Sequence, residues 1–476
     1  MTESADGFDA VVVGAGPNGI VAALTLAKAG RRVLLLEAQD RIGGALRSAE
    51  LTLPGFIHDV GATVLPLALA SPAFRSLSPE LAGVSWAHPD VPVAHPLDDG
   101  AVLLHRDVEQ TAADLGRDGN AWRRLVAPVV TGGDRLADAL LSPLSASAAL
   151  RAAGPLTRYC LTGVLPARGL ARAAFRGDAA AALFAGLAGH AVLRLSQLST
   201  AGYATFMAGL AHRVGWPVVA GGSQNLVAAL ESALRRHGVE VQTGVRITDL
   251  DELPRAASTI LDVSPRQLLD IASDRFSPRY RRGLERFRYG PGVFKIDWAL
   301  DGPVPWADPA VGKAATVHLG ATMREIAAAE REVSLGRHPA RPYVICVQPC
   351  VADPTRAPQG KHTLWAYCHV PNGSTRDMTE EIEGQLERFA PGFRDRVLAR
   401  HVLNPQRLEA FDANLIGGDI GGGAADLRQF VARPMLRARP WATPIRGLFL
   451  GSASTPPGGG VHGMGGWHAA HLALRG

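Results

Sequence analysis

Short apolar runs alternate with stretches of helical spacing near the start of the chain. Residues 10–13 form a run of small and β-branched apolar side chains closed by a glycine, a pattern typical of a buried parallel strand. A helical pattern begins near Pro17, and the run RVLLLE then predicts a second strand that ends at Glu37. This order of strand, turn, helix and strand predicts an α/β unit with a parallel sheet.

A glycine pattern fills the predicted turn between the first strand and its helix. Gly14, Gly16 and Gly19 form the motif GxGxxG around Ala15. In such a unit the first glycine permits the tight turn, the second lets the backbone approach a pyrophosphate, and the third lets the helix pack on the strand. Glu37 is placed to accept hydrogen bonds from a ribose diol. The unit therefore predicts a dinucleotide site; the acid disfavours NADP, and FAD and NAD both stay open on this evidence.

The pattern changes twice in the middle of the chain. Residues 77–214 are rich in Ala, Leu and Arg at helical spacing, which predicts a helical insertion. Residues 215–265 return to the α/β order, with a helix expected over 224–236 and a strand over 239–243. The segments VFKIDWAL and HTLWAYCHV then alternate, which predicts the strands of a second, β-rich insertion.

The segment HTLWAYCHV has two different faces if it is a strand. Trp365, Tyr367 and His369 share one face, and Leu364, Ala366 and Cys368 share the other. One interpretation makes the first face the wall of an apolar substrate pocket beside the cofactor. The alternative is that these aromatic side chains only cover a helix or a sheet edge.

The end of the chain is unusually rich in glycine. The sequence RGLFLGSASTPPGGGVHGMGGWHAAHLAL predicts a short strand, a turn at Gly451 and Ser452, and a last helix that begins near Val461. Backbone N–H groups of the turn can meet a pyrophosphate, and the glycines at 458–460 let the backbone pass close to a flat ring. The helix dipole would stabilise negative charge at the ring edge. His462 in this loop is a candidate acid or base, or a residue that stabilises the loop.

Several of these segments resemble one family. The run EAQDRIGGALRSAELTLPGFIHDVGATVLP is similar to the second flavin-contact segment of the amine oxidase and phytoene desaturase superfamily, EAxxxxGG followed by GFxxDxG. Residues 347–371 resemble phytoene-dehydrogenase-related oxidoreductases, and the chain end resembles the GxxTHPGGGVxG close of phytoene desaturases and their pyridine-nucleotide-oxidoreductase-like relatives. Many amine oxidases carry Arg at the position of Ala45, so this departure favours the desaturase branch.

The resemblance implies FAD as the cofactor and a set of contacts to it. Gly44 and Ala45 would pass the flavin-side phosphate, Gly61, Ala62 and Thr63 would lie beside the isoalloxazine, and Val245 would reach adenine through its backbone. The full predicted cofactor set is Gly14, Ala15, Gly16, Gly19, Glu37, Ala38, Gly43, Gly44, Ala45, Arg47, Gly61, Ala62, Thr63, Val245, Gly451, Ser452, Gly460, Val461 and His462. Since no second GxGxxG follows a strand, a second dinucleotide is not expected.

Composition narrows the class of protein further. The chain has 476 residues, 47% of them hydrophobic and 20% charged, which suits a globular protein of two domains or one large domain with insertions. The net charge of +5 contains no basic block, so nucleic acid is not an expected partner. Four cysteines without a CxxC, and no metal-ligand spacing, argue against a disulfide reductase and a metal site. The polar start predicts a cytoplasmic location.

These observations combine into one expected organisation and activity. We expect an α/β protein whose Rossmann-like FAD-binding domain is split into residues 1–75, 215–270 and 425–476, with a mixed α+β substrate domain from 76–214 and 271–424. The resemblance implies an FAD-dependent oxidoreductase of desaturase or dehydrogenase type that transfers hydride at flavin N5 with an apolar, polyene-like or isoprenoid-like substrate. The alternative is a non-turnover FAD-binding scaffold or a flavin-dependent isomerase. The sequence specifies neither the electron acceptor nor a catalytic acid or base.

One basic stretch bears on the partners of the protein. Residues 151–178 carry Arg151, Arg158, Arg168, Arg172 and Arg176 among bulky apolar side chains. Such a mixture is typical of a segment that lies on an anionic membrane surface. The alternative is the wet side of a helical cap over a core, or the contact of a homodimer, and it is the commoner role because most amphipathic helices face a protein core.

Overall fold

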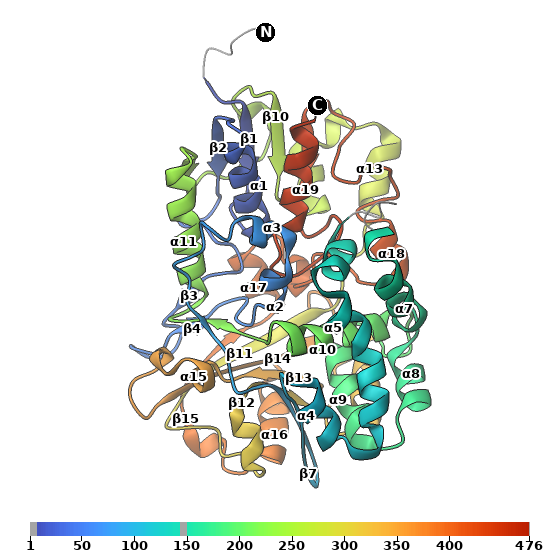
Figure 1. The fold of residues 1–476 in the computed structure, drawn as a ribbon. Helices are drawn as coiled ribbons and strands as arrows, with labels where there is room; N and C mark the ends of the chain where they lie inside the picture. Colours follow the sequence, from blue (N-terminus) through green and yellow to red (C-terminus); the bar gives the residue numbers. More distant parts are fainter. Residues whose placement is uncertain (1–6, 143–149, 476) are drawn as a thin grey trace.

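The computed structural model describes residues 7–142 and 150–475 of the chain. Within them the structure has two main sheets, one above the other in Figure 1, with a group of helices to one side of the larger sheet. The first strand, β1 (Ala10–Val13), and the last helix, α19 (Met464–Ala473), both lie at the top, in the part of the protein that contains the smaller sheet. None of the helices in these residues has the length and apolar character needed to cross a bilayer.

The smaller sheet is parallel and is built from three separate parts of the sequence. Its strand order is β16-β10-β1-β2-β9, with β1 (Ala10–Val13), β2 (Val33–Leu36), β9 (Glu240–Gln242), β10 (Ser258–Leu261) and β16 (Leu448–Leu450). All four pairings are parallel. The strand predicted over residues 239–243 is one residue shorter at each end. Every side chain of β1 and β2 is buried, as expected for strands covered on both faces.

Helices cover both faces of this sheet. On one face lie α1 (Pro17–Lys28), α11 (Ser223–Arg236) and α19 (Met464–Ala473), which share one apolar core with Val12, Leu35 and Ile260. On the other face α12 (Pro265–Ala272) and α13 (Pro278–Glu285) pack against Val11 and Leu34. α1 and α19 pack directly against one another, so the first and last helices of the chain lie side by side (Figure 1).

The larger sheet has the strand order β15-β11-β14-β13-β12-β6-β7. Its strands are β6 (Val91–Leu97), β7 (Gly100–Leu104), β11 (Gly292–Leu300), β12 (Ala314–Leu319), β13 (Val344–Val347), β14 (His362–Val370) and β15 (Val397–Leu403). The segments VFKIDWAL and HTLWAYCHV are the adjacent strands β11 and β14, paired antiparallel over their whole length. The alternating pattern of both segments therefore predicted their structure.

The expectation that residues 77–214 are entirely helical is wrong for their first part. β5 (Trp86–Ala87) pairs with β8 (Val218–Val219), and β6 and β7 form a hairpin at the edge of the larger sheet. β6 also pairs in parallel with β12, which lies more than 200 residues later. The partner strand β12 is too distant in sequence for any pattern of neighbouring residues to reveal it. The apolar residues 91–97 by themselves do not distinguish a strand from a helix. Such long-range pairing is decided by tertiary contacts.

The rest of that insertion is helical. It consists of α4 (Val108–Asp114), α5 (Gly119–Leu141), α7 (Ala153–Gly163), α8 (Ala167–Ala174), α9 (Asp178–Gly189) and α10 (Thr200–Arg213). α9 packs on β6 and β7 and on α10, and so covers one face of the larger sheet. α14 (Met323–Ser334) packs beside α9 on that face, and α16 (Thr379–Phe389) lies against the opposite face.

Short helices complete the connections. They are α2 (Pro66–Ala70), α3 (Pro72–Ser76), α15 (Pro349–Ala352), α17 (Pro405–Phe411) and α18 (Leu427–Val431), and a two-stranded pair is formed by β3 (Ser48–Ala49) and β4 (His58–Asp59). The chain crosses between the sheets near β4, near β8 and before α17, and the candidate site lies where these crossings meet.

Candidate functional site

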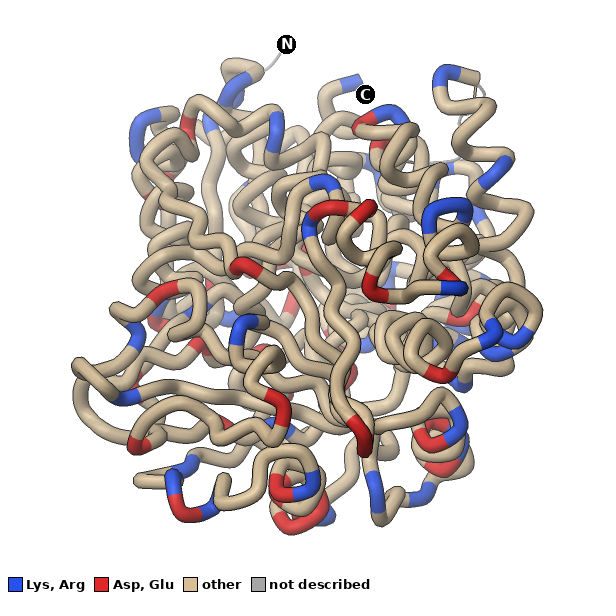
Figure 2. The backbone as a smooth tube through the Cα atoms, turned by 60° about the horizontal axis from the view of Figure 1, so that its bottom comes forward, with Lys and Arg blue, Asp and Glu red and all other residues tan. Residues whose placement is uncertain are grey.

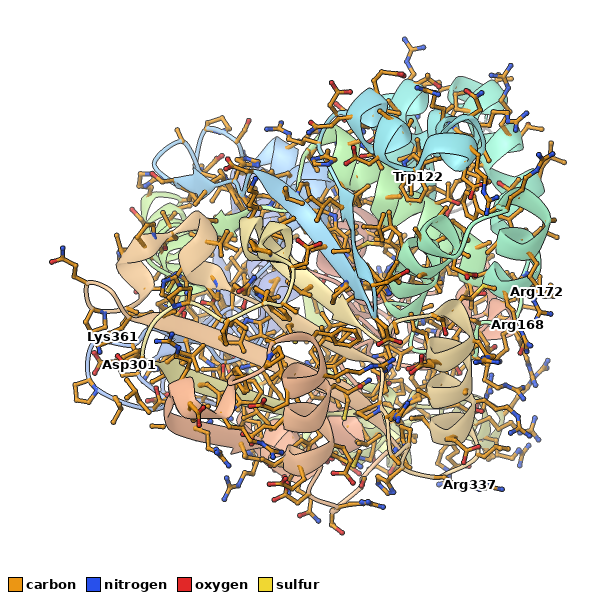
Figure 3. All side chains as sticks on the ribbon, turned by 90° about the horizontal axis from the view of Figure 1, so that it is seen from below. Trp122, Arg168, Arg172, Asp301, Arg337 and Lys361 are labelled. Atoms are coloured by element: carbon orange, nitrogen blue, oxygen red, sulfur yellow. The ribbon has the colours of Figure 1, made fainter. Side chains whose placement is uncertain are left out.

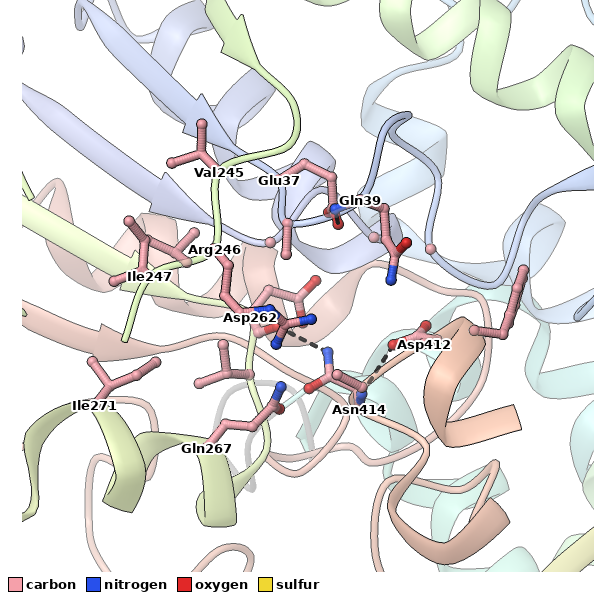
Figure 4. A pocket seen from close by; sticks show the side chains of 18 of the residues that line it. Glu37, Gln39, Val245, Arg246, Ile247, Asp262, Gln267, Ile271, Asp412 and Asn414 are labelled. Carbon is pink, nitrogen blue, oxygen red and sulfur yellow. Dashed lines mark hydrogen bonds between the residues drawn. The ribbon is translucent and has the colours of Figure 1, made fainter. Parts of the chain in front are cut away.

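A cavity of about 310 Å³ opens at the carboxyl ends of β1, β2 and β10. Figure 4 shows Glu37, Asp262 and Asn414 around it, each from a different part of the chain. In open α/β sheets this end of the strands is where nucleotide ligands bind. The predicted residues that line this cavity are Gly14, Gly16, Glu37, Ala38, Gly44, Arg47 and Val245.

The glycines of the first turn have the geometry that the motif predicts. Gly14 has φ +94, a conformation that favours glycine. A Cβ on Gly19 would lie 1.8 Å from the carbonyl oxygen of Gly14, so only glycine lets α1 pack here. A Cβ on Gly44 would lie 2.9 Å from the Cα of Gly16. The backbone segments at Gly16 and Gly44 therefore lie close to one another, at the position expected for a pyrophosphate.

Glu37 is held at the cavity by backbone donors. Its Oε2 accepts from the N–H of Ala15 at 2.7 Å, and its Oε1 accepts from the N–H of Gln39 at 2.9 Å. Each carboxylate oxygen has a second lone pair, so the group can still accept from ribose hydroxyls. Ala15 does not line the cavity, and its contribution is this backbone contact to Glu37.

We expect Glu37→Ala to weaken FAD binding by about 1–3 kcal/mol, because a charged hydrogen-bond acceptor is lost. FAD fluorescence during titration of the apoprotein measures the effect. Glu37→Gln is the matched control, since it keeps the shape and one acceptor oxygen and should lose less. Unchanged affinity in Glu37→Ala would contradict the assignment of this residue to the ribose.

The opposite wall of the cavity comes from the segment that follows α17. Arg47 donates to the carbonyl oxygens of Gly44 at 3.1 Å and Phe411 at 2.5 Å, and its guanidinium lies 3.9 Å from the centre of the Phe411 ring. Asn414 donates to the backbone carbonyl of Asp262 at 2.9 Å, while its Oδ1 has no partner among the described residues. Sequence reasoning missed residues 411–414, because no local pattern marks them and they approach the site only through the fold.

Val245 lines this cavity as predicted, but its backbone N–H is already engaged. That N–H donates to the carbonyl oxygen of Glu37 at 2.8 Å. The backbone group of Val245 that stays available to adenine is its carbonyl oxygen.

Asp262 is a buried carboxyl group directly beside the phosphate-binding turn. Its Oδ2 accepts from the N–H of Gly19 at 2.9 Å, and it lines both this cavity and the one described below. Burial raises its pKa from 3.8 to about 8, helped by the nearby carboxylates of Asp412 and Glu37 and opposed by the Gly19 hydrogen bond. Asp262 is therefore neutral at pH 7, which suits a site for an anionic pyrophosphate.

This shift predicts a pH dependence of FAD binding. Asp262 is neutral below about pH 8 and becomes anionic above it, beside the FAD phosphates, so the FAD dissociation constant should rise between pH 7 and pH 9. The raised pKa of Asp262 also lowers the free energy of unfolding of the apoprotein as the pH rises from about 4 to 8, since the unfolded chain loses the Asp262 proton at lower pH than the folded chain does. Asp262→Asn keeps the acceptor for Gly19 and should flatten the FAD profile. An equally steep profile in that variant would contradict the prediction.

A second cavity of about 360 Å³ continues from the first towards the larger sheet. Gly16, Asp262, Asp412 and Asn414 line both, so the two cavities form one continuous site. Of the predicted cofactor residues, Gly16, Ala45, Gly61, Ala62, Thr63, Ser452, Gly460 and Val461 line this second cavity. The residues fit FAD: the first cavity suits its adenosine diphosphate part, and the second suits a flat ring held between 61–63 and 460–461.

Several predicted cofactor residues act through packing instead. Gly43 and Gly451 donate backbone hydrogen bonds to Ala15 at 2.8 Å and to Leu261 at 2.8 Å, and neither lines a cavity. Gly19 likewise serves the contact of α1 with the turn. These glycines shape the site by packing behind the residues that line it. The local sequence cannot distinguish this role from direct contact with the cofactor.

The glycines of the last loop do not all lie beside the position of a flat ring, as the sequence had predicted. α19 begins at Met464, three residues later than predicted. A Cβ on Gly459 would lie 2.6 Å from the carbonyl oxygen of Gly421, and one on Gly466 would lie 1.8 Å from that of Asn18. Most of these glycines therefore permit close backbone contacts within the protein, and Gly460 alone among residues 458–460 lines the cavity.

His462 stabilises this loop. It is 1% exposed, its Nε2 lies 3.1 Å from the carbonyl oxygen of Gly458, and its Nδ1 accepts from the N–H of Met464 at 3.0 Å. Burial lowers its pKa to about 4. Both ring nitrogens are used within the loop and the ring does not line the cavity, so His462 has no atom available to act as an acid or base.

The floor of the second cavity is one face of the larger sheet. The strand registers place side chains in two rows across β12, β13, β14 and β11: Thr316, Val347, Trp365 and Asp297 in one, and His318, Ile345, Tyr367 and Lys295 in the next. Trp365 and Tyr367 line the cavity with stacked rings 5.8 Å apart. Leu364, Ala366 and Cys368 lie in the core on the other side.

His369 lies on the same face of β14 but does not line the cavity. Its Nδ1 lies 2.8 Å from Oε1 of Glu330 on α14, and both side chains are buried. The pocket predicted from Trp365, Tyr367 and His369 therefore includes the first two residues only, because α14 covers the third.

Sequence reasoning also missed a buried charge network beneath the cavity. Lys295 donates to both carboxylate oxygens of Asp297 at 2.6 Å and to the backbone carbonyl of Asp59 at 3.1 Å, and its ammonium lies 5.4 Å from the centre of the Trp365 ring. Among the described residues that line the cavity, it is the one Lys or Arg. The alternation of VFKIDWAL did not reveal that this pair is buried, because the pattern suggests a solvent face for the two charges whereas every residue of β11 is buried.

Arg356 continues this network away from the cavity. Its Nη2 donates to Asp59 at 3.1 Å and its Nε donates to Asp353 at 2.9 Å, with all three side chains almost fully buried. Asp59 in turn accepts from the N–H of Ser223 at 2.8 Å. The network therefore ties the segments around β4, α11 and α15 together directly below the flavin-side cavity.

Comparison with known proteins agrees with this geometry. Residues 12–78 match the model of the NAD(P)-binding Rossmann-like domain. The chain is 26% identical to pyridine nucleotide-disulfide oxidoreductase domain-containing protein 2 of Rattus norvegicus, over 98% of this chain and 93% of that protein. It is 36% identical to hydroxyneurosporene desaturase of Cereibacter sphaeroides, over 33% of this chain and 31% of that protein.

Solved structures show the same fold. A double mutant of putrescine oxidase, made in a redesign of cofactor binding, superimposes with a TM-score of 0.62 at 17% identity, covering 98% of both chains. The structure and the comparisons therefore agree. The structural features are the split Rossmann-like sheet, the glycine turn with Glu37 and the continuous double cavity. The protein is an oxidoreductase with a Rossmann-like fold and FAD as its cofactor.

Proposed function

We propose that this protein is a desaturase-type or dehydrogenase-type flavoenzyme that acts on a carbon–carbon bond of an apolar substrate. Bound FAD supplies hydride transfer at its N5 atom. The observation that carries the proposal is the cavity floor, where Ile345, Val347, Trp365 and Tyr367 offer an apolar surface beside the flavin-side segment 61–63. Such a surface binds and dehydrates a hydrocarbon chain.

The charges around the cavity favour this substrate class over an amine. Putrescine oxidase acts on a diamine, which is cationic at neutral pH, and a cation needs carboxylates that are free to receive it. Here the ammonium of Lys295 lines the cavity, and the carboxylate of Asp297 is already paired with it. Asp262 and Asp412 also line the cavity, but burial raises the pKa of both and so disfavours their charged form. A cationic substrate would meet a like charge in this position, so an uncharged one is favoured.

Lys295 has a further role in this proposal. Its three contacts to Asp297 and Asp59 fix the ammonium at the floor of the cavity, next to Trp365. A fixed positive charge there holds the floor rigid and can orient a polar group or a water at the flavin edge. The protein thus contributes position, exclusion of water and one fixed charge.

The test starts from the purified holoprotein. We expect a yellow protein that releases FAD and not FMN on denaturation, and whose solvent extract contains an apolar compound identifiable by mass spectrometry. Under anaerobic conditions that compound, or its saturated form, should bleach the visible flavin absorbance, and an added quinone should restore it. A protein that is bleached by diamines and not by apolar compounds would overturn the proposal. A protein that no compound bleaches would favour the alternative of a non-turnover scaffold.

We further propose that the substrate is taken from an anionic membrane surface. Leu161 is 68% exposed, and the neighbouring Val164 and Leu165 are also exposed, close in sequence to Arg158, Arg168 and Arg172. Figure 3 shows Arg168 and Arg172 at the outer edge of the helical part of the protein. Elsewhere in Figure 2 basic and acidic residues are interspersed along the outside of the chain. Exposed apolar side chains beside arginines suit a lipid headgroup boundary.

We expect the protein to sediment with vesicles that contain anionic lipid at low salt, and to be released at high salt because the attraction is partly electrostatic. Arg168→Glu combined with Arg172→Glu should reduce binding at least about thirtyfold, since each of the two basic residues contributes about 1 kcal/mol. The matched control replaces Arg324 and Arg337, which lie on and after α14, by Glu. Equal loss in the control pair, or no sedimentation at low salt, would reject this surface.

A further inference from the structure

Two residues that line the second cavity also lie at the surface of the protein. Among the described residues that line this cavity, Ile420 and Gly460 are the two that are exposed. The backbone segments beside them touch, since a Cβ on Gly459 would lie 2.6 Å from the carbonyl oxygen of Gly421. A Cβ on Gly460 would lie 2.6 Å from Cδ1 of Leu67, which also lines the cavity. These residues form the mouth of the cavity, and glycine at position 460 keeps a side chain out of it.

The chain that continues from this mouth presents apolar side chains to solvent. Twelve large apolar side chains are exposed among the described residues, and five of them lie within residues 420–436. A cluster of this kind marks an interaction site, whereas single exposed apolar residues do not. We call these five side chains, each between 36% and 78% exposed, the mouth patch: Ile420, Leu427, Phe430, Val431 and Leu436.

Helix α18 within this segment is turned the opposite way from an ordinary surface helix. Its polar residue Gln429 is buried, donates to the carbonyl oxygen of Arg288 at 2.8 Å and accepts from the N–H of Arg288 at 3.1 Å. Its apolar residues Leu427, Phe430 and Val431 face outwards. A surface helix normally buries its apolar side and exposes its polar side, so this helix presents its apolar side to a partner.

The mouth patch projects from a fixed base. Nη2 of the buried Arg433 donates to the carbonyl oxygen of Gly423 at 2.6 Å, and its Nη1 donates to that of Ala453 at 3.1 Å. Ala453 lines the second cavity. Met435 packs against α13, since a Cβ on Gly283 would lie 2.7 Å from its Cε. The segment is therefore joined both to the cavity wall and to α13.

The charge around the mouth patch is positive. Residues 427–439 contain four Arg and no acid, and α13 contains three Arg and one acid. The guanidinium of Arg437 lies 5.2 Å from the centre of the Tyr280 ring, so the segment and α13 contribute to one surface. Asp426, the acid that precedes α18, is paired with Arg288. The patch therefore combines bulky apolar side chains with arginines, and its charge suits an anionic partner.

A second copy of this chain fits this patch poorly. A twofold contact places the same patch on both subunits, so arginines of one copy would face arginines of the other. The surface of an anionic bilayer offers acyl chains to the apolar side chains and phosphate groups to the arginines. Of these two occupants, the bilayer matches both features.

The mouth patch also adjoins the surface that carries Arg168 and Arg172. Tyr159 of α7 donates to the carbonyl oxygen of Gly202 on α10 at 3.0 Å. Burial raises the pKa of the next residue, Tyr203, and the positive charge of Arg433 opposes this rise, so Arg433 lies near α10. Figure 1 shows α7, α13 and α18 on one side of the protein.

We propose that the second cavity opens directly towards an anionic bilayer, with the mouth patch among the acyl chains and Arg428 and Arg437 at the lipid phosphates. This inference rests on the apolar substrate and the membrane surface of the proposed function, and it adds the entrance through which the substrate passes. An apolar molecule then moves between bilayer and cavity beside Ile420 without crossing water, which dissolves it poorly.

The test locates single labelled sites of the FAD-loaded protein relative to the bilayer. Cys160 is replaced by Ser, because the other three cysteines are buried, and a nitrobenzoxadiazole dye is attached to Ile420→Cys, Leu436→Cys or Leu398→Cys. Leu398, the control, is exposed on β15 at the edge of the larger sheet. On vesicles of phosphatidylcholine and phosphatidylglycerol, spin-labelled lipid should quench the dye severalfold at positions 420 and 436 and leave it unchanged at 398.

A pair of substitutions tests the contribution of the patch to binding. Val431→Asp combined with Leu436→Asp should weaken sedimentation with the same vesicles at least tenfold, because two apolar side chains no longer enter the bilayer. The thermal unfolding midpoint should stay unchanged, since both side chains are exposed. Leu335→Asp combined with Leu398→Asp is the matched control at two other exposed leucines, and should leave sedimentation unchanged.

Three results would overturn the inference. They are an unquenched dye at position 420 or 436, equal quenching at position 398, and equal sedimentation of the two Asp pairs. Self-association that the Val431→Asp and Leu436→Asp pair abolishes would assign the patch to a second copy and would overturn it as well. Quenching reads position and not turnover, so sedimentation without quenching at 420 and 436 rejects this entrance alone. Failure of the proposed reaction is reported separately by the bleaching of the flavin.

Discussion

Replacing Arg356 by Leu is expected to lower the free energy of unfolding by about 3–5 kcal/mol, the loss typical of breaking a buried ion pair from one side. The guanidinium is fully buried between Asp59 and Asp353 and also donates to the carbonyl oxygen of Val219 at 3.1 Å. Leu would leave two buried carboxylates without their cation. Because these residues join the segments below the flavin-side cavity, FAD should also be lost more readily from the variant.

The thermal unfolding midpoint, followed by near-ultraviolet circular dichroism with and without added FAD, measures this loss. Arg341→Leu is the matched control, since Arg341 is exposed and its replacement should change stability by less than about 0.5 kcal/mol. Equal unfolding midpoints for the two variants would show that the network below the cavity contributes nothing specific to stability.

Replacing Gly466 by Ala is expected to separate the last helix from the first. The added Cβ would lie 1.8 Å from the carbonyl oxygen and 2.6 Å from the carbonyl carbon of Asn18, and these backbone atoms cannot turn aside as a side chain can. Overpacking of this kind costs about 1–3 kcal/mol, which exceeds the gain of about 1 kcal/mol in helix propensity. Asn18 lines the flavin-side cavity, so FAD affinity should fall at least tenfold, about 1.4 kcal/mol.

Gly384→Ala provides the matched control within a helix. Gly384 lies in the middle of α16, is exposed, and has no heavy atom within 4 Å of the position of an added Cβ. Its replacement should stabilise the protein by about 0.5–1 kcal/mol and leave FAD binding unchanged. If Gly466→Ala behaved in the same way, the close contact of α19 with α1 would not be required for the cofactor site.

The sequence by itself determined the parts of this protein that depend on local pattern. The strand of residues 10–13, the glycine turn, Glu37 and the returning strand at 448–450 follow from short-range rules, because a buried parallel strand and a phosphate-binding turn each need particular residues at fixed spacing. The alternation of HTLWAYCHV likewise predicted the strand and the face that Trp365 and Tyr367 share, while the fold decided that this face borders the cavity.

Tertiary structure decided everything that depends on which distant segments meet. The hairpin β6–β7 is a strand pair because β12 lies beside it, and His369 is excluded from the cavity because α14 covers it with Glu330. Asp262 is neutral because burial and neighbouring carboxylates from other segments act on it. Burial, charge proximity and strand partners are properties of pairs of segments, so a pattern read along one segment cannot contain them.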